Sequence, residues 1–69
     1  MQLLETVADD LAKRSLAAMD ALDDDTITKQ VAEALGASST TLQEAFLTAV
    51  RIRRAEARAL RLLEGLGAE

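Results

Sequence analysis

The 69-residue sequence contains no cysteine, histidine, proline, tryptophan or tyrosine, and phenylalanine occurs only once. Without cysteine and histidine the chain cannot form a disulfide or a conventional zinc site. It also lacks a glycine-rich phosphate loop, and its serines have no histidine base to activate them. We therefore predict that the protein is not an enzyme, and we expect no catalytic, cofactor-binding or metal-binding residues.

Long uncharged apolar runs and a basic-then-apolar leader are also missing. The most basic segment has alanines where a helix lying on a membrane would place tryptophan, phenylalanine or several leucines. These absences predict a soluble, cytoplasmic protein that does not bind membranes. At this length a single core is only marginally sufficient, so stability must come from helix packing, from self-association, or from both.

The composition is rich in alanine and leucine, which predicts an all-α fold. We expect one domain over residues 1–69, with helices at about 2–22, 26–35 and 39–64. In the first helix an apolar stripe recurs at three- and four-residue steps. Its members are Leu4, Val7, Ala8, Leu11, Ser15, Ala18, Met19 and Leu22.

The helix ends are predicted from local signals. Asp23–Asp25 should end the first helix, because carboxylates are unfavourable at its negative pole. Thr26 is the expected N-cap of the second helix, and Gly36 should end it in the left-handed conformation. Ser38 is the expected N-cap of the third helix.

The third helix should be roughly 38 Å long, which is more than two short partners can cover. We therefore expect its far end to pack on something else. Its expected inner face consists of Leu42, Ala45, Phe46, Ala49, Ile52, Ala59, Leu62 and Leu63.

Residues 28–47 fit the pattern of a helix–turn–helix, in which a small residue lies at the helix crossing and a glycine at the turn. The seven diagnostic positions all carry suitable residues, namely Val31, Ala32, Leu35, Gly36, Ala37, Leu42 and Ala45. Several of these would match by chance in a chain so rich in alanine and leucine. The alternative is an ordinary helical hairpin.

The stretch VAEALGASSTTLQEAF resembles the helix–turn–helix of AraC-type transcription regulators. The matching residues are Gly36, Ser38, Thr41, Leu42, Gln43 and Phe46. At two positions where the family pattern has arginine, this chain has Thr40 and Glu44. The family's second helix–turn–helix is missing. A helix–turn–helix followed by a long helix is also similar to phage small terminase subunits. The resemblance implies a trihelical DNA-binding fold whose third helix enters the major groove.

Charge is distributed unevenly along the chain. Residues 1–25 balance at −5, residues 26–46 at −1 and residues 47–69 at +2, for a net −4. Four arginines, at positions 51, 54, 58 and 61, form one helical stripe, with Arg53 to one side. The stripe suits recognition of phosphate or carboxylate, or it is a solvated surface with local pairing to Glu56 and Glu64. The acidic total weighs against tight non-specific DNA binding.

These observations lead to two hypotheses. The first is a small non-enzymatic helix–turn–helix protein that binds DNA as an oligomer, either a transcription regulator or a phage-type DNA-recognition subunit. The predicted DNA-binding residues are Lys29, Ser39, Thr40, Gln43, Arg51, Arg54, Arg58 and Arg61. The alternative is an adaptor, anti-regulator or docking domain that binds another protein through the acidic first helix or the arginine stripe.

Self-association is expected under both hypotheses, as a homodimer or a higher oligomer. An antiparallel or head-to-tail pair would place Asp9, Asp10 and Asp20 opposite arginines of a second chain. The predicted interface residues are Leu4, Leu11, Ile52, Ala59, Leu62 and Leu63.

Overall fold

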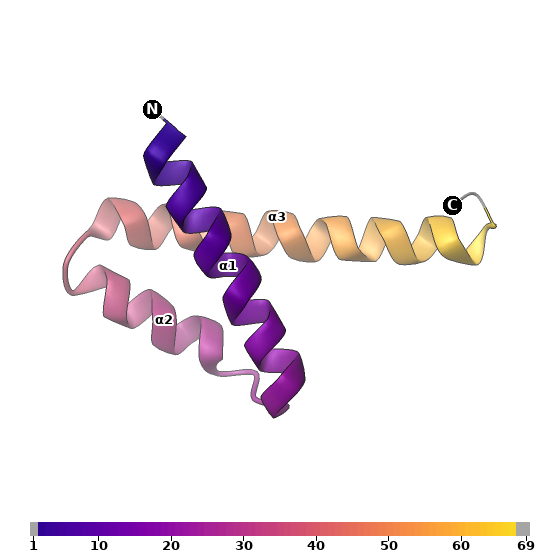
Figure 1. Cartoon of the computed structure of the whole chain (residues 1–69), viewed down its shortest axis with the longest axis horizontal. Coiled ribbons are helices and arrows are strands. Elements are labelled where there is room, and N and C mark those ends of the chain that lie inside the picture. The colour runs from indigo at the N-terminus through magenta and orange to yellow at the C-terminus, as the bar shows by residue number, and fades with distance from the viewer. Residues whose placement is uncertain (1, 68–69) are drawn as a thin grey trace.

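The computed structural model describes residues 2–67, and within that range three helices and no strands are present. They are α1 (Gln2–Leu22), α2 (Ile27–Gly36) and α3 (Thr40–Gly65), shown in Figure 1. The predicted all-α fold with a long third helix is confirmed. The bounds of α1 agree with the prediction, whereas α2 and α3 each begin and end one residue later than expected.

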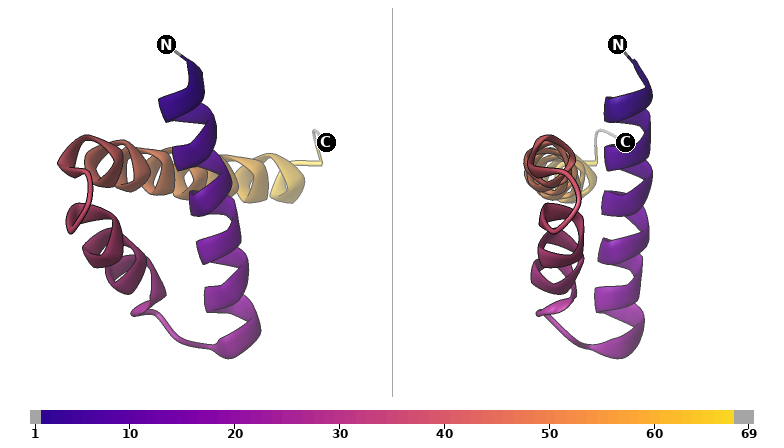
Figure 2. Two further views of the ribbon diagram at one scale, coloured as in Figure 1. Left: turned by 60° about the vertical axis from the view of Figure 1, so that its left-hand side comes forward. Right: turned by 90° about the vertical axis from the view of Figure 1, so that its left-hand side faces the viewer.

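The helices form two layers. Figure 2 shows α2 and α3 together in one layer, with α1 lying across them in the other. α2 returns beside the first turns of α3, and α1 crosses α3 steeply (Figure 1). The Cα atoms extend over 44 × 31 × 12 Å, so the molecule is flat. The second half of α3 projects beyond both other helices.

The core is small and lies where the three helices meet. It consists of Ala12, Ala32, Phe46 and Val50, with partly buried side chains packed around them. Phe46 is the only phenylalanine in the chain and is completely buried. The half-buried residues that surround this core are Leu11, Leu16, Val31, Leu35, Leu47 and Ala49.

The face of α1 that meets α3 is made of very small side chains. Ala8, Ala12 and Ser15 are all buried, with exposed fractions of 1%, 0% and 5%. Small side chains let two helix backbones approach closely, because the interaxial distance is set by the residues at the contact. Ser15 Oγ donates a hydrogen bond to the Leu11 carbonyl of its own helix at 2.7 Å, so its burial needs no partner on α3.

The predicted inner faces are partly wrong. In α1, Val7 and Leu22 are exposed at 36% and 68%, while Ala12 was missed. In α3, the buried Val50 was missed. Four residues of the predicted inner face are instead exposed, namely Ile52, Ala59, Leu62 and Leu63. The reason is tertiary: the crossing of α1 selects one narrow face of α3. An apolar period by itself cannot show which of two faces will be covered.

The turn between α1 and α2 is built differently from the expectation. Asp23 takes the left-handed conformation (φ 52°), and Thr26 precedes α2 as predicted. The Thr26 side chain does not cap α2. Instead, Asp24 Oδ1 accepts hydrogen bonds from Thr26 Oγ1 at 2.7 Å and Thr26 N at 2.9 Å. These two bonds lower the pKa of Asp24 below its usual value.

Two predictions about the turn between α2 and α3 are also corrected. Gly36 is not left-handed but is the last residue of α2, and the only described glycine with positive φ is Gly67 (72°). The N-cap of α3 is Ser39 rather than Ser38, since Ser39 Oγ accepts a hydrogen bond from Leu42 N at 3.1 Å.

The close crossing of α1 and α3 generates a test. Replacing Ala12 by leucine should lower the free energy of unfolding by about 1–3 kcal/mol, because the crossing has no room for the added atoms. The matched control is Ala17→Leu, an exposed position on the same helix, which should change it by less than about 0.5 kcal/mol. Urea unfolding followed by circular dichroism measures both. Equal effects of the two substitutions would contradict a tight crossing.

Candidate functional site

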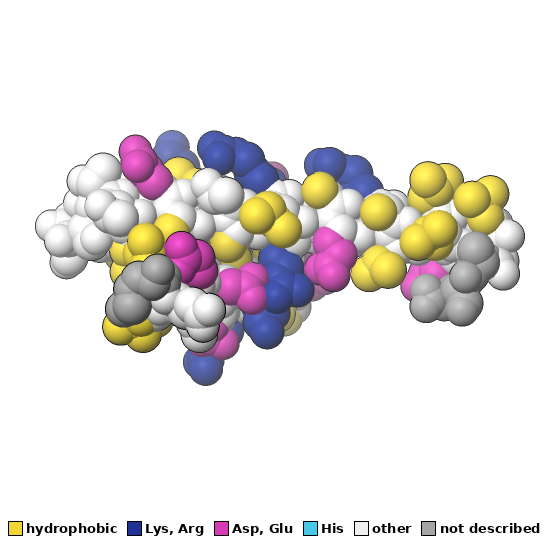
Figure 3. All heavy atoms as spheres, turned by 90° about the horizontal axis from the view of Figure 1, so that it is seen from above, with side chains coloured by type: hydrophobic (Ala, Val, Ile, Leu, Met, Phe, Trp, Pro, Cys, Tyr) yellow, Lys and Arg dark blue, Asp and Glu magenta, His cyan; other side chains and the backbone are white. Residues whose placement is uncertain are grey.

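The last turns of α3 have no tertiary cover from the described residues. Every residue from Arg58 to Gly67 is exposed. Five large apolar side chains in α3 and at the residue after it are exposed at 43–70%, and these are Ile52, Leu60, Leu62, Leu63 and Leu66. Figure 3 shows apolar side chains gathered along this projecting part of the helix. Contiguous exposed apolar surface of this kind marks an interaction site in a native protein.

The exposed apolar side chains follow a regular spacing. Ile52, Ala55, Ala59, Leu62 and Leu66 recur at alternating steps of three and four residues, and all five are exposed. We refer to these five residues as the apolar row. At 3.6 residues per turn the row lies opposite the buried Phe46 and Val50. A repeat of 3.5 residues is the pattern by which one helix packs along another.

A groove between α1 and α3 adjoins the start of the apolar row. Its α3 wall is formed by small or apolar side chains, Ala45, Thr48, Ala49 and Ile52. Its α1 wall is largely acidic and contains Glu5, Thr6, Ala8, Asp9, Asp10 and Lys13. A second, more apolar groove lies at the N-terminal ends of α1 and α3. It is lined by Leu3, Leu4, Val7, Ser39 and Leu42, and we call it the N-terminal groove.

Four arginines occupy a separate stripe of α3. Arg51, Arg54, Arg58 and Arg61 are all exposed, and among the described residues none lies within ion-pair distance of a carboxylate. Arg54 Nη2 lies 3.8 Å from Met19 Sδ on α1. Figure 3 shows basic side chains following one edge of α3 beside the apolar side chains.

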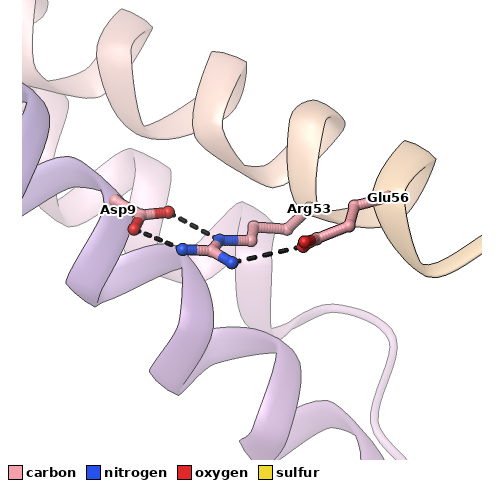
Figure 4. A network of polar contacts seen from close by, with 3 residues as sticks. All are labelled: Asp9, Arg53 and Glu56. Carbon is pink, nitrogen blue, oxygen red and sulfur yellow. Dashed lines mark hydrogen bonds and ion pairs between the residues drawn. The ribbon is translucent and has the colours of Figure 1, made fainter. Parts of the chain in front are cut away.

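Arg53 differs from the other arginines because it joins α3 to α1 (Figure 4). Its Nε donates to Asp9 Oδ1 at 2.7 Å and its Nη2 to Asp9 Oδ2 at 2.6 Å, a bidentate pair. Nη1 also donates to Glu56 Oε1 at 3.2 Å. The hydrogen bonds from Arg53 hold the pKa of Asp9 below its usual value, and those to Asp9 raise the pKa of Arg53.

This pairing changes one expectation from the sequence. Asp9 was expected to face an arginine of a second chain, but the crossing of the helices places it against Arg53 of its own chain. Asp10 forms an exposed pair with Arg14 one turn along α1, at 2.9 Å. Asp20, the third residue expected to face an arginine of a second chain, is exposed and forms no ion pair among the described residues.

Gln43 is the other correction among the predicted site residues. It was expected on the solvent side of a recognition helix, but it is half-buried and its Nε2 donates to the Ala32 carbonyl at 2.9 Å. The side chain lies directly over Gly36, where a Cβ atom would be 2.5 Å from Nε2. A side chain at position 36 would therefore displace the Gln43 amide from this place. The sequence signal for this contact is the glycine itself, although its position also fits the left-handed turn that the sequence predicts.

The remaining predicted DNA-binding residues, apart from the arginines, lie on α2 and at the start of α3. Lys29 is exposed on α2, and Thr40 is exposed at the first residue of α3. Ser39 is half-buried and uses its hydroxyl to cap α3. The first basic residue of α3 is Arg51, so the opening turns of this helix carry no positive charge.

The predicted interface residues divide into two groups. Ile52, Ala59, Leu62 and Leu63 are exposed on α3. Leu4 is half-buried in the wall of the N-terminal groove. The prediction for Leu11 is wrong, because this residue packs against the core of its own chain.

No protein-family model matches the chain, and comparison with curated proteins and with solved structures gives no significant match. The resemblance to AraC-type regulators therefore stays a prediction. Among residues 2–67, no helix has the length and apolar character that crossing a membrane requires. The same residues contain no group of three or more acidic side chains arranged to hold a metal ion.

Proposed function

We propose that the protein is a non-enzymatic helical interaction module that works by self-association through α3. The observation that carries the proposal is the exposed apolar surface on the second half of α3. The contacts of α1 with α3 reach along it to Arg53 and Arg54. Among the described residues nothing covers Leu62, Leu63 and Leu66. A second polypeptide supplies the cover that the fold of one chain leaves out.

The energies are consistent with a moderate affinity. Burying one leucine contributes about 1.5–3 kcal/mol, and a symmetric dimer would bury several from each chain. Association is opposed by roughly 4–15 kcal/mol of lost translational and rotational freedom. The balance supports a dissociation constant on the order of 100 µM, which corresponds to about −5.5 kcal/mol.

Recognition of DNA bases by the start of α3 is less well supported. Gln43, the side chain best suited to contact an adenine edge, is hydrogen bonded to α2. Glu44 is exposed in the same region and would repel phosphate. A protein interface does not depend on either residue.

Self-association can be measured directly. Sedimentation equilibrium over about 5–500 µM should show a dimer or a larger species forming with concentration. The double substitution Leu62→Lys and Leu66→Lys should weaken association at least ~100-fold, because apolar contacts of ~1.5–3 kcal/mol are lost from each chain. Leu22→Lys is the matched control, since Leu22 is 68% exposed but lies at the end of α1. A wild-type protein that stays monomeric, or equal effects of the two changes, would contradict the proposal.

A second function, binding to the DNA backbone by the assembled protein, is favoured by the arginine stripe. Its four guanidinium groups are exposed and have no carboxylate partner among the described residues. Guanidinium groups bind phosphate in a bidentate manner, and two copies of the stripe would double the contacts. This function needs no base-reading residue at the start of α3.

Fluorescence anisotropy with a labelled random duplex tests the second function. We expect binding at about 20 mM salt that weakens steeply by about 200 mM. Changing Arg54 and Arg58 to glutamine should reduce the slope of log K against log salt by about 4, because each arginine supplies one phosphate contact in each of the two chains. Arg14→Gln, an exposed arginine on α1, is the control and should leave the slope unchanged. Absence of binding at the lower salt concentration would exclude this function.

A further inference from the structure

We infer that two chains pair through antiparallel α3 helices, so that the C-terminal end of each α3 covers the N-terminal groove of the other chain. This inference rests on the proposed self-association and adds the identity of the contacting surfaces. The occupant of the exposed face is a second copy of the same chain. The pair has two-fold symmetry, with each chain contributing the same surfaces.

The apolar row extends backward along the whole of α3. Thr41, Ala45 and Thr48 precede Ile52 at the same alternating steps of four and three residues. Ala45, Thr48 and Ile52 also form part of the α3 wall of the groove beside α1. A helix that packs on the apolar row can therefore continue along this groove without leaving the same face of α3.

The residues along this face favour close packing of a second helix. The positions between the leucines and the groove are Ala55 and Ala59, which add little bulk beyond the helix backbone, and Ala45 within the groove wall is equally small. Two helices can approach closely where such small residues meet. The larger side chains, Leu62 and Leu66, are concentrated at one end.

The direction follows from where the apolar surfaces lie. Leu62, Leu63 and Leu66 lie at the C-terminal end of α3, and the N-terminal groove lies at its start. Residues 42 and 63 are separated by roughly 32 Å along a helix, so one chain cannot bring its own two surfaces together. In an antiparallel pair, the leucines at the end of α3 in each chain contact the N-terminal groove of the other chain. A parallel pair would cover the leucines but would leave Leu3 (62% exposed) and Val7 (36% exposed) in water.

The charges are compatible with the same direction. In a two-fold antiparallel pair the same flank of each α3 faces its partner, and the arginine stripe lies on the side away from α1 (Figure 3). With residue 63 opposite residue 42 of the other chain, Arg61 comes level with Glu44, which is exposed on that side. Opposite charges at an interface fix its orientation and accelerate encounter.

Cross-linking of engineered cysteines distinguishes the arrangements, because the chain contains no cysteine of its own. Leu3→Cys and Leu66→Cys are made in separate chains of different tag length and mixed under oxidising conditions. We expect the mixed disulfide between Cys at 3 and Cys at 66 to form at least ~10-fold faster than in a control mixture of Leu22→Cys with Leu66→Cys, because pairing raises the effective thiol concentration. All three positions are exposed at 62–70%, so the substitutions leave the core intact.

The outcomes separate this inference from the proposed function. Rapid self-cross-linking of Leu66→Cys, without the mixed product, would show a parallel pair and overturn the inference while self-association stands. Cross-linking no faster than the control, in variants that sediment as dimers, would also overturn it. Variants and wild type that sediment as monomers would overturn both the inference and the proposed function. Sedimentation of each variant before oxidation makes these outcomes distinct.

Discussion

The close crossing of α1 over α3 is the constraint on which the rest of the structure depends. Ala8, Ala12 and Ser15 bring the backbone of α1 down onto the face of α3 that carries Phe46 and Val50. Larger side chains at these positions would separate the two helices and open the core. Because the crossing is steep, α1 covers only a short length of α3 (Figure 1).

The same crossing determines which polar groups are available for a partner. It places Asp9 against Arg53, so this arginine belongs to the fold, and it leaves the arginine stripe without carboxylate partners among the described residues. It also leaves the apolar row on the opposite face of α3. α3 therefore supports the core on one side and exposes the apolar row on the other. Its two halves differ in how much tertiary support they receive.

Much of the fold could be predicted from the sequence because the decisive signals are local. Asp23–Asp25, Thr26 and the serines before α3 place the helix ends within one residue. That α3 is longer than the other two helices can cover was also expected, from the helix length alone. The roles of Gln43, Gly36 and Ala12 could not be predicted in this way. Each depends on how closely one helix approaches another, and a single sequence contains no direct record of that distance.

The central claim is that the end of α3 is supported by a second chain and not by its own. Amide hydrogen exchange, measured residue by residue at about 20 µM and about 1 mM protein, tests this claim most directly. The account predicts that amides of residues 59–65 are protected at the higher concentration and lose protection on dilution, while those of Phe46 and Val50 keep theirs. Protection of residues 59–65 that does not depend on concentration would contradict it.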